Sequence, residues 1–218
     1  MSQYLSKEDI IKEFSKCGKS IIYFIDLYCK ILEPQKGLIP FKTWPFQKKL
    51  VEDFVDFRFN IVLKSRQLGI STLTAAYIVW LMIFFRGKSI LIVATKQKTA
   101  GVLFKKVKVM FSNLPPWVSK FVKVKVDNAT SLSLDNGSEV KITAISADAG
   151  RADSLSLLVI DEAAHVEGLE DLWTALSPTL AAGGRCIALS SPNGCGNWFH
   201  KVFSHAELQL NEFHPTKV

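Results

Sequence analysis

The order of apolar and polar positions along the chain predicts buried strands separated by helices. Four short segments are almost entirely apolar, as strands covered on both faces are, and they lie at residues 59–63, 89–94, 157–160 and 186–189. Residues 71–85 are apolar nearly all round, which is typical of a helix packed inside a domain. Such strands alternating with helices predict an α/β fold with a parallel sheet covered on both faces.

Further elements are predicted upstream and downstream of these strands. Residues 4–32 have a helical pattern opened by a possible cap at Ser6, and residues 33–37 break it as a linker. The other elements are a helix at 47–54, a helix at 103–114 with Lys105, Lys106 and Lys108 on its polar side, a hairpin at 132–145 around Asn136-Gly137, and a helix at 169–182 broken at Pro178. We therefore expect a helical region with a linker at residues 1–37, followed by one domain at residues 38–218.

Composition favours an intracellular protein with a sizeable core. Hydrophobic residues make up 48% of the 218 positions and charged residues 22%, which argues against disorder. The cysteines form no C-x-x-C pair, so reduced thiols are expected at Cys17, Cys29, Cys186 and Cys195. The longest apolar run, residues 77–85, falls short of the about 20 residues that a membrane span needs. No signal-peptide pattern opens the chain.

Charge is distributed unevenly along the chain. Residues 57–126 contain 13 Lys or Arg and no Asp or Glu, whereas the remaining residues hold 14 basic and 20 acidic side chains. A carboxylate-free block in an otherwise acidic chain suggests a face for a polyanion, such as nucleotide phosphates or nucleic acid. Lysines on solvated helix faces are the alternative.

The residues that follow the first predicted strand resemble a phosphate loop, and parallel sheets bind ligands at such strand ends. Residues 64–72 read Lys-Ser-Arg-Gln-Leu-Gly-Ile-Ser-Thr. In the pattern G-x-x-x-x-G-K-[ST], Gly69 and Ser71 are in place, Lys64 takes the first position, and Ile70 stands where the lysine belongs. Taken alone, an ordinary polar strand-to-helix loop explains the segment equally well.

The third predicted strand ends in two carboxylates, Asp161 and Glu162, in the Walker B form. Asp161 would hold Mg²⁺ and Glu162 would polarise an attacking water. A surface turn is the alternative, because Asp-Glu pairs are common. The combination with the upstream loop nevertheless predicts a nucleotide hydrolase.

Weaker candidates lie near other strand ends. Residues 190–194 (Ser-Ser-Pro-Asn-Gly) could sense the γ-phosphate and relay its state, or form a plain capped turn. Gln47 could read an adenine edge. Arg151 could contact phosphate or a neighbouring subunit, or pair with a nearby Asp. The histidines show no metal-ligand spacing and are expected to be structural or exposed: His165, His200, His205 and His214.

The chain resembles the ATPase domain of the large terminase subunit of tailed bacteriophages. Four segments, in their order along the chain, carry this resemblance: residues 44–47, 65–72, 158–164 and 190–194. The resemblance covers roughly residues 41–203, and the S-R-Q-x-G-x-[ST] loop with S-P-N-G downstream is its specific part. It implies a RecA-like ASCE P-loop ATPase that uses ATP and Mg²⁺ to drive double-stranded DNA into a procapsid. The implied partners are DNA, the portal, the small terminase subunit and further copies in a ring, in the host cytoplasm and without a membrane.

By position, the resemblance also implies a role for each motif residue. ATP binding is assigned to the adenine-reading glutamine and to the whole loop: Gln47, Lys64, Ser65, Arg66, Gln67, Leu68, Gly69, Ile70, Ser71 and Thr72. The metal ligands would be Ser71 and Asp161, and the catalytic residues Glu162 and Arg66, the latter on the γ-phosphate. The coupling motif would be Ser190, Ser191 and Pro192.

The sequence departs from the family pattern in two ways. Ile70 cannot neutralise phosphate, so a displaced but working lysine at Lys64 is favoured over a dead site. Little chain follows the coupling motif, so we expect no C-terminal nuclease here and no DNA cleavage. The alternatives are a superfamily 2 helicase-like translocase fragment, and a P-loop DNA-binding or scaffold module with impaired catalysis.

Overall fold

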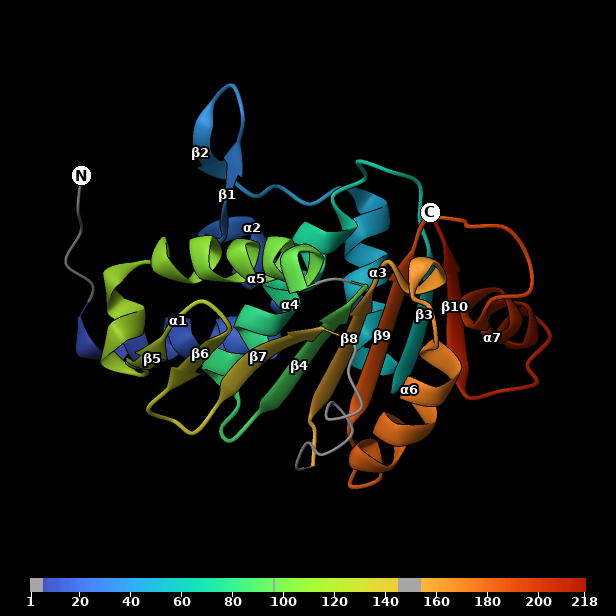
Figure 1. The fold of residues 1–218 in the computed structure, drawn as a ribbon. Helices are drawn as coiled ribbons and strands as arrows, with labels where there is room; N and C mark the ends of the chain where they lie inside the picture. Colours follow the sequence, from blue (N-terminus) through green and yellow to red (C-terminus); the bar gives the residue numbers. More distant parts are fainter. Residues whose placement is uncertain (1–5, 96, 145–153) are drawn as a thin grey trace.

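The computed structural model describes residues 6–95, 97–144 and 154–218. Its centre is an eight-stranded sheet in the order β10-β3-β9-β8-β4-β7-β6-β5 (Figure 1). Neighbouring strands from β10 to β7 are parallel, whereas β6 and β5 are antiparallel additions at one edge. The strands are β3 (Phe59–Leu63), β4 (Ser89–Ala94), β5 (Val124–Asp127), β6 (Ser131–Leu134), β7 (Glu139–Ala144), β8 (Leu157–Asp161), β9 (Arg185–Ser190) and β10 (Phe213–Lys217). The mostly parallel α/β sheet is therefore confirmed, with the four predicted apolar strands as β3, β4, β8 and β9.

Helices cover both faces of the sheet, which explains why its central strands are apolar throughout. In β8, Leu157 and Val159 join the core on one face, while Leu158 and Ile160 join the core on the other. The first face carries α1 (Lys7–Lys19), α2 (Ile21–Tyr28), α3 (Pro45–Asp56), α4 (Ile70–Phe84) and α5 (Gln97–Ser112). The second carries α6 (Leu169–Leu176), α7 (Trp198–Glu207) and the short helix η3 (Ala163–His165). Within the described ranges, further short helices are η1 (Pro116–Lys120) and η4 (Ser177–Leu180).

Helix α4 lies at the centre of the first face and is covered by the N-terminal helices. The indole Nε1 of Trp80 donates to the carbonyl oxygen of Cys17 at 2.8 Å. The ring of Phe84 contacts those of Phe14 and Phe24. Helices α1 and α2 thus share one hydrophobic core with α4. The division after residue 37 stays a prediction.

The prediction for the N-terminal segment was wrong in two places. Ser20 ends α1 and caps α2, since its Oγ accepts the backbone N–H of Tyr23, so the helical stretch is broken. The segment predicted to be the end of this helix and a linker forms an antiparallel hairpin of β1 (Lys30–Glu33) and β2 (Gly37–Pro40). The carboxylate of Glu33 stabilises the turn of this hairpin, because it accepts hydrogen bonds from the backbone N–H groups of Gln35 and Lys36. The hairpin projects from the body above α5 (Figure 1).

The predicted turn at Asn136-Gly137 is confirmed. It joins β6 to β7, and Gly137 has the positive φ of 85° that such a turn requires. The predicted break at Pro178 is also present, where α6 gives way to η4. No helix in the described ranges combines the length and apolarity needed to cross a membrane.

Candidate active site

The strand order brings three of the predicted motifs to one edge of the sheet. Strand β9 lies between β3 and β8, with Ser190 opposite Leu63 and Leu189 opposite Asp161. The backbone N–H of Lys64 donates to the carbonyl oxygen of Ser190 at 2.9 Å. The loop after β3, the carboxylates after β8 and the serines after β9 therefore converge, as expected for strand ends of a parallel sheet.

A cavity of about 490 Å³ opens between these strand ends, a size in the range of ligand sites. Its lining includes predicted residues from all three motifs: Lys64, Arg66, Gln67, Ser71, Glu162 and Ser191. It also includes Thr95, Thr99 and His165. Arg66 and Ser65 are exposed, so the arginine is free to move toward a ligand.

The loop turns tightly into α4, whose first turn presents backbone N–H groups that suit phosphate. Gly69, the N-cap of α4, has φ +72°, and Gln67 also lies in the left-handed region. The side chain of Ile70 is only 2% exposed and belongs to the core around α4. Ile70 is thus a packing residue, and the charge of the loop has to come from other positions.

Gln47 ties the start of α3 to this loop. Its Oε1 accepts the backbone N–H of Trp44 at 3.0 Å, and its Nε2 donates to the carbonyl oxygen of Leu68 at 2.9 Å. The side chain is buried. Its predicted adenine-reading role stays a prediction.

Lys64 is directed into the cavity and bridges the loop to the carboxylates. Its side chain is 8% exposed, and its Nζ donates to Oε1 of Glu162 at 2.7 Å. Burial alone would raise the pKa of Glu162, but the hydrogen bond and charge of Lys64, with help from Ser191, lower it below the usual value. Glu162 also has φ +53°, a strained value for a non-glycine residue that is common at functional sites.

Asp161 is the more buried of the two carboxylates. It is 6% exposed, and its Oδ1 accepts the backbone N–H of Glu162 at 3.1 Å. Burial raises the pKa of Asp161, although Lys64 opposes this shift. A carboxylate in such a place is stabilised by a nearby cation.

The serine segment after β9 is hydrogen-bonded to the end of β8. Ser191 Oγ donates to Oε2 of Glu162 at 3.2 Å, and Ser190 Oγ accepts the backbone N–H of Ala164 at 3.0 Å. His165 is exposed, one of the two outcomes expected for it, yet its Nε2 lies 3.3 Å from Ser191 Oγ at the cavity. Pro192 is exposed beside them. The carboxylate of Glu162 therefore links Lys64 on one side to Ser191 on the other.

Sequence reasoning missed three polar residues around the loop. Thr95 and Thr99 follow the buried strand β4, so the strand-end rule could have found them. Lys106 was placed on the polar side of α5, but its Nζ donates to Oγ1 of Thr72 at 3.0 Å, at the start of α4. That contact joins two helices that are far apart in the sequence, so no local sequence pattern predicts it. Arg151 lies outside the described residues.

Residues 61–211 match the family model of the terminase large subunit, T4likevirus-type, N-terminal. The ATPase domain of the Thermus phage P74-26 large terminase is 19% identical, with a TM-score of 0.66 and 81% of each chain covered. The HK97 bacteriophage large terminase is 19% identical, with a TM-score of 0.73, over 92% of this chain and 43% of that one. A large terminase from a thermophilic bacteriophage, in complex with ATP-gamma-S, is 16% identical, with a TM-score of 0.59, over 79% of this chain and 44% of that one.

These likenesses show a shared fold, and the chain spans less than half of the two longer terminases. The family model covers well over half of the chain and includes the loop, the carboxylates and the serine segment. On that match, the chain belongs to the family of T4likevirus-type terminase large subunits, as their N-terminal domain.

Proposed function

We propose that this chain is the ATP-hydrolysing domain of a motor that packages double-stranded viral DNA into a procapsid. The observation that carries the proposal is the carboxylate of Glu162, held between Lys64 and Ser191 at the mouth of a phosphate-type loop. Family membership supports the same activity. The nucleotide complex among the similar structures supports ATP as the substrate.

In this proposal, Lys64 and Arg66 bind the β- and γ-phosphates in place of the lysine that Ile70 replaces. Incoming phosphate oxygens compete with Glu162 for the ammonium of Lys64, which lies 2.7 Å from that carboxylate. Once released, Glu162 orients a water and accepts its proton. Arg66 supplies charge to the transition state, where a guanidinium clamps phosphate oxygens well.

The residues present fit a magnesium ion. In the part of the chain that the structure describes, no three His, Cys, Asp or Glu side chains converge into a metal cluster. Mg²⁺ prefers one or two protein oxygens plus water and phosphate, and Ser71 with Asp161 would supply that set. Burial disfavours the charged form of Asp161 and so raises its pKa, and a bound cation would offset this cost. When bound, the ion would neutralise charge on the β- and γ-phosphates.

We further propose that Ser190, Ser191 and Pro192 couple hydrolysis to movement. Because Ser191 donates to the Glu162 carboxylate, a shift of that carboxylate would act directly on the residue that follows β9, while Ser190 at the end of β9 is bonded to the backbone of Ala164. Duplex DNA would meet the carboxylate-free block of residues 57–126. The portal, the small terminase subunit and further copies in a ring are the proposed assembly partners, in the host cytoplasm.

The test is ATP turnover by the 218-residue chain with and without duplex DNA. We expect Mg²⁺-dependent phosphate release that DNA changes and that Glu162→Gln removes. Strand separation of a duplex would favour the helicase-like alternative instead. Absence of turnover in the presence of Mg²⁺ and DNA would favour a binding or scaffold module.

A further inference from the structure

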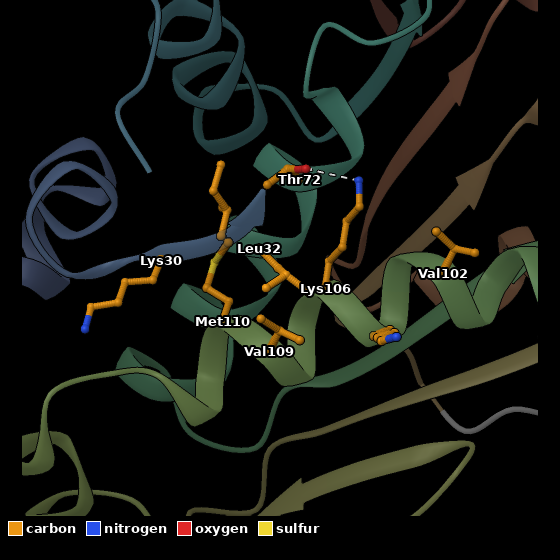
Figure 2. A pocket seen from close by; sticks show the side chains of 9 residues that line it. Lys30, Leu32, Thr72, Val102, Lys106, Val109 and Met110 are labelled. Atoms are coloured by element: carbon orange, nitrogen blue, oxygen red, sulfur yellow. Dashed lines mark hydrogen bonds between the residues drawn. The ribbon is translucent and has the colours of Figure 1, made fainter. Parts of the chain in front are cut away.

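An apolar groove lies between the β1–β2 hairpin and α5, and we call it the hairpin groove (Figure 2). It encloses a cavity of about 300 Å³. Leu32 from β1 and Val102 from α5 line the cavity, yet more than half of each residue is exposed. Leu38, also exposed, is the cross-strand partner of Leu32 and extends the same face of the hairpin. Apolar side chains gathered in this way on a surface are typical of an interaction site.

The hairpin groove carries positive charge. Lys30, Lys105 and Lys106 line it, and both Lys30 and Lys105 are exposed. No Asp or Glu is among the described residues that line the cavity. A partner that covers the groove therefore needs apolar side chains together with negative charge. A symmetric contact of one groove with another would bring lysines together, which disfavours it.

A segment elsewhere on the chain has the complementary chemistry. Residues 207–212 read Glu-Leu-Gln-Leu-Asn-Glu, run from the last residue of α7 to the start of β10, and are called the leucine loop below. Leu208 and Leu210 are 68% and 67% exposed, the two highest values for large apolar side chains in the described ranges. The flanking Glu207 and Glu212 are also exposed. The loop thus offers two leucines between two carboxylates.

Hydrogen bonds hold the leucine loop in one conformation. The backbone N–H of Leu210 donates to the carbonyl oxygen of His205 at 2.8 Å, and Nδ2 of Asn211 donates to that of Val202 at 2.8 Å. Gln209 has φ +58°, a value that costs energy for a residue other than glycine. A fixed loop loses little conformational freedom when it binds, so its leucines are preorganised for a partner.

The hairpin groove and the leucine loop lie on opposite sides of the molecule (Figure 1). Helix α5 belongs to the core on the first face of the sheet and contacts β4 and β7. Helix α7 belongs to the core on the second face, and the loop leads from it into the edge strand β10. One chain can therefore contact a different neighbour through each of the two surfaces at the same time.

We propose that the leucine loop of one copy of this chain docks into the hairpin groove of the next copy. Leu208 and Leu210 pack against the leucines of the hairpin, and the two glutamates face the lysines of the groove. Because the two surfaces differ, the contact is heterologous, and its repetition gives a closed ring or a filament. The inference rests on the proposed function only for the ring that this contact would build, and it does not depend on ATP hydrolysis.

The experiment is sedimentation velocity of the 218-residue chain and of two double variants. The loop variant, Leu208→Asp with Leu210→Asp, keeps the hairpin groove, and the groove variant, Leu32→Asp with Val102→Asp, keeps the leucine loop. The parent chain should form species larger than a dimer as its concentration rises, while each variant alone stays monomeric. An equimolar mixture of the two should form a 1:1 complex, because one intact groove meets one intact loop and the assembly ends there.

Charge reversal tests the choice of partner. Lys30→Glu with Lys105→Glu should weaken association by about tenfold, the size expected for two exposed ion pairs. Adding Glu207→Lys with Glu212→Lys should restore association to within about threefold of the parent chain, because each charge then meets its opposite again.

The control for the apolar substitutions is Ile11→Asp with Val126→Asp, which changes two exposed apolar residues on α1 and β5, outside both surfaces. This variant should associate like the parent chain. Thermal melts of all variants exclude unfolding as the cause of a change. ATP turnover, measured at a concentration where the parent chain is monomeric, should be the same in every variant.

The outcomes separate this inference from the ATPase proposal. A parent chain that stays monomeric, or a mixture that forms no 1:1 complex, overturns the contact and leaves the ATPase proposal standing. Association that the second charge reversal does not restore overturns the pairing of the loop with the groove. A 1:1 complex of chains that hydrolyse no ATP would keep the contact and overturn the ATPase proposal.

Discussion

The side chain of Gln47 occupies the space that a Cβ on residue 69 would need: its Nε2 would lie 2.8 Å from that atom. Gly69 also has φ +72°, which strains any other residue. The two residues fix the loop between β3 and α4, so the glycine is required for two independent reasons.

Gly69→Ala should therefore weaken nucleotide binding by about 5- to 150-fold, since a strain of about 1–3 kcal/mol falls directly on the loop. The measurement is calorimetric titration with ATP. Gly101→Ala is the control, because Gly101 lies inside α5 with open space at its Cβ. It should be neutral or stabilising by up to about 1 kcal/mol. Equal effects of the two substitutions would contradict the strain argument.

Glu162→Gln should keep ATP binding and lower turnover by about 10² to 10⁴, the usual contribution of a positioned base. Lys64 keeps a polar partner in this variant, since the amide oxygen can still accept its hydrogen bond. Steady-state phosphate release and ATP titration give the two readouts. Glu167→Gln, at an exposed position nearby, is the control. Turnover close to that of the parent chain would move the base to another residue.

Lys64→Ala should abolish hydrolysis and weaken ATP binding, because it removes the cation that replaces the missing lysine of the loop. Arg66→Ala should lower kcat more than it weakens binding, as expected for a group that serves transition-state charge. Ile70→Ala separates packing from charge: it should lower stability by about 2–5 kcal/mol while folded molecules still turn over. A structure with an ATP analogue in which only Arg66 reaches the phosphates would end the displaced-lysine idea.

Asp26→Asn should destabilise the fold at neutral pH but much less in acid. Burial would raise the pKa of Asp26, but hydrogen bonds from Thr43 and the ion pair with Lys48 lower it below 3.8. A carboxyl whose pKa is lower in the folded than in the unfolded protein stabilises the fold at pH values above its unfolded-state pKa. That stabilisation is lost as the pH falls through its folded-state pKa. The expected loss is about 1–3 kcal/mol near neutrality, by denaturant unfolding.

The same comparison in increasingly acid solution should show a shrinking difference between the two proteins, because the carboxyl is protonated in both states once the pH has fallen below its lowered folded pKa. Glu52→Gln, at an exposed position on α3, provides the control and should behave like the parent chain at every pH. A loss for Asp26→Asn that does not depend on pH would show that the ion pair and hydrogen bonds are not its cause.

Duplex DNA binding should be independent of sequence and should weaken steeply with salt, as counterion release requires. Lys123→Glu and Lys125→Glu change two exposed lysines of the carboxylate-free block. Each should flatten the slope of log affinity against log salt by about 1 if it contacts a phosphate. Lys12→Glu, exposed but outside the block, is the control. Binding that ignores salt would remove the electrostatic interpretation.

Much of the fold and the meeting point of the motifs could be predicted because both depend on local signals. Strands such as β8 are apolar throughout since helices cover both faces, and the rule of strand ends then places Lys64, Glu162 and Ser191 together. Strand β10 gave no such signal, because its Phe-His-Pro-Thr-Lys sequence contains a proline, which only an edge position tolerates.

Other features depend on contacts that a local pattern does not carry. The short strand β1 is compatible with the end of a helix until pairing with β2 decides its conformation. The reach of Lys106 to Thr72 depends on how α5 packs beside α4. The two amide contacts of Gln47 depend likewise on where the loop lies relative to α3. Each of these is a tertiary relationship between segments that are separate in sequence.

The cover that α1 and α2 give to α4 sets the minimum fragment for biochemical work. The match to the family begins at residue 61, yet the rings of Trp80 and Phe84 are enclosed by residues far upstream of that point. A truncation at that point would leave α4, whose residues 73–83 are all buried in the structure, facing water, and such surfaces aggregate. Poor expression of that fragment would reflect the loss of the helices that cover α4, not a defect of the ATPase site.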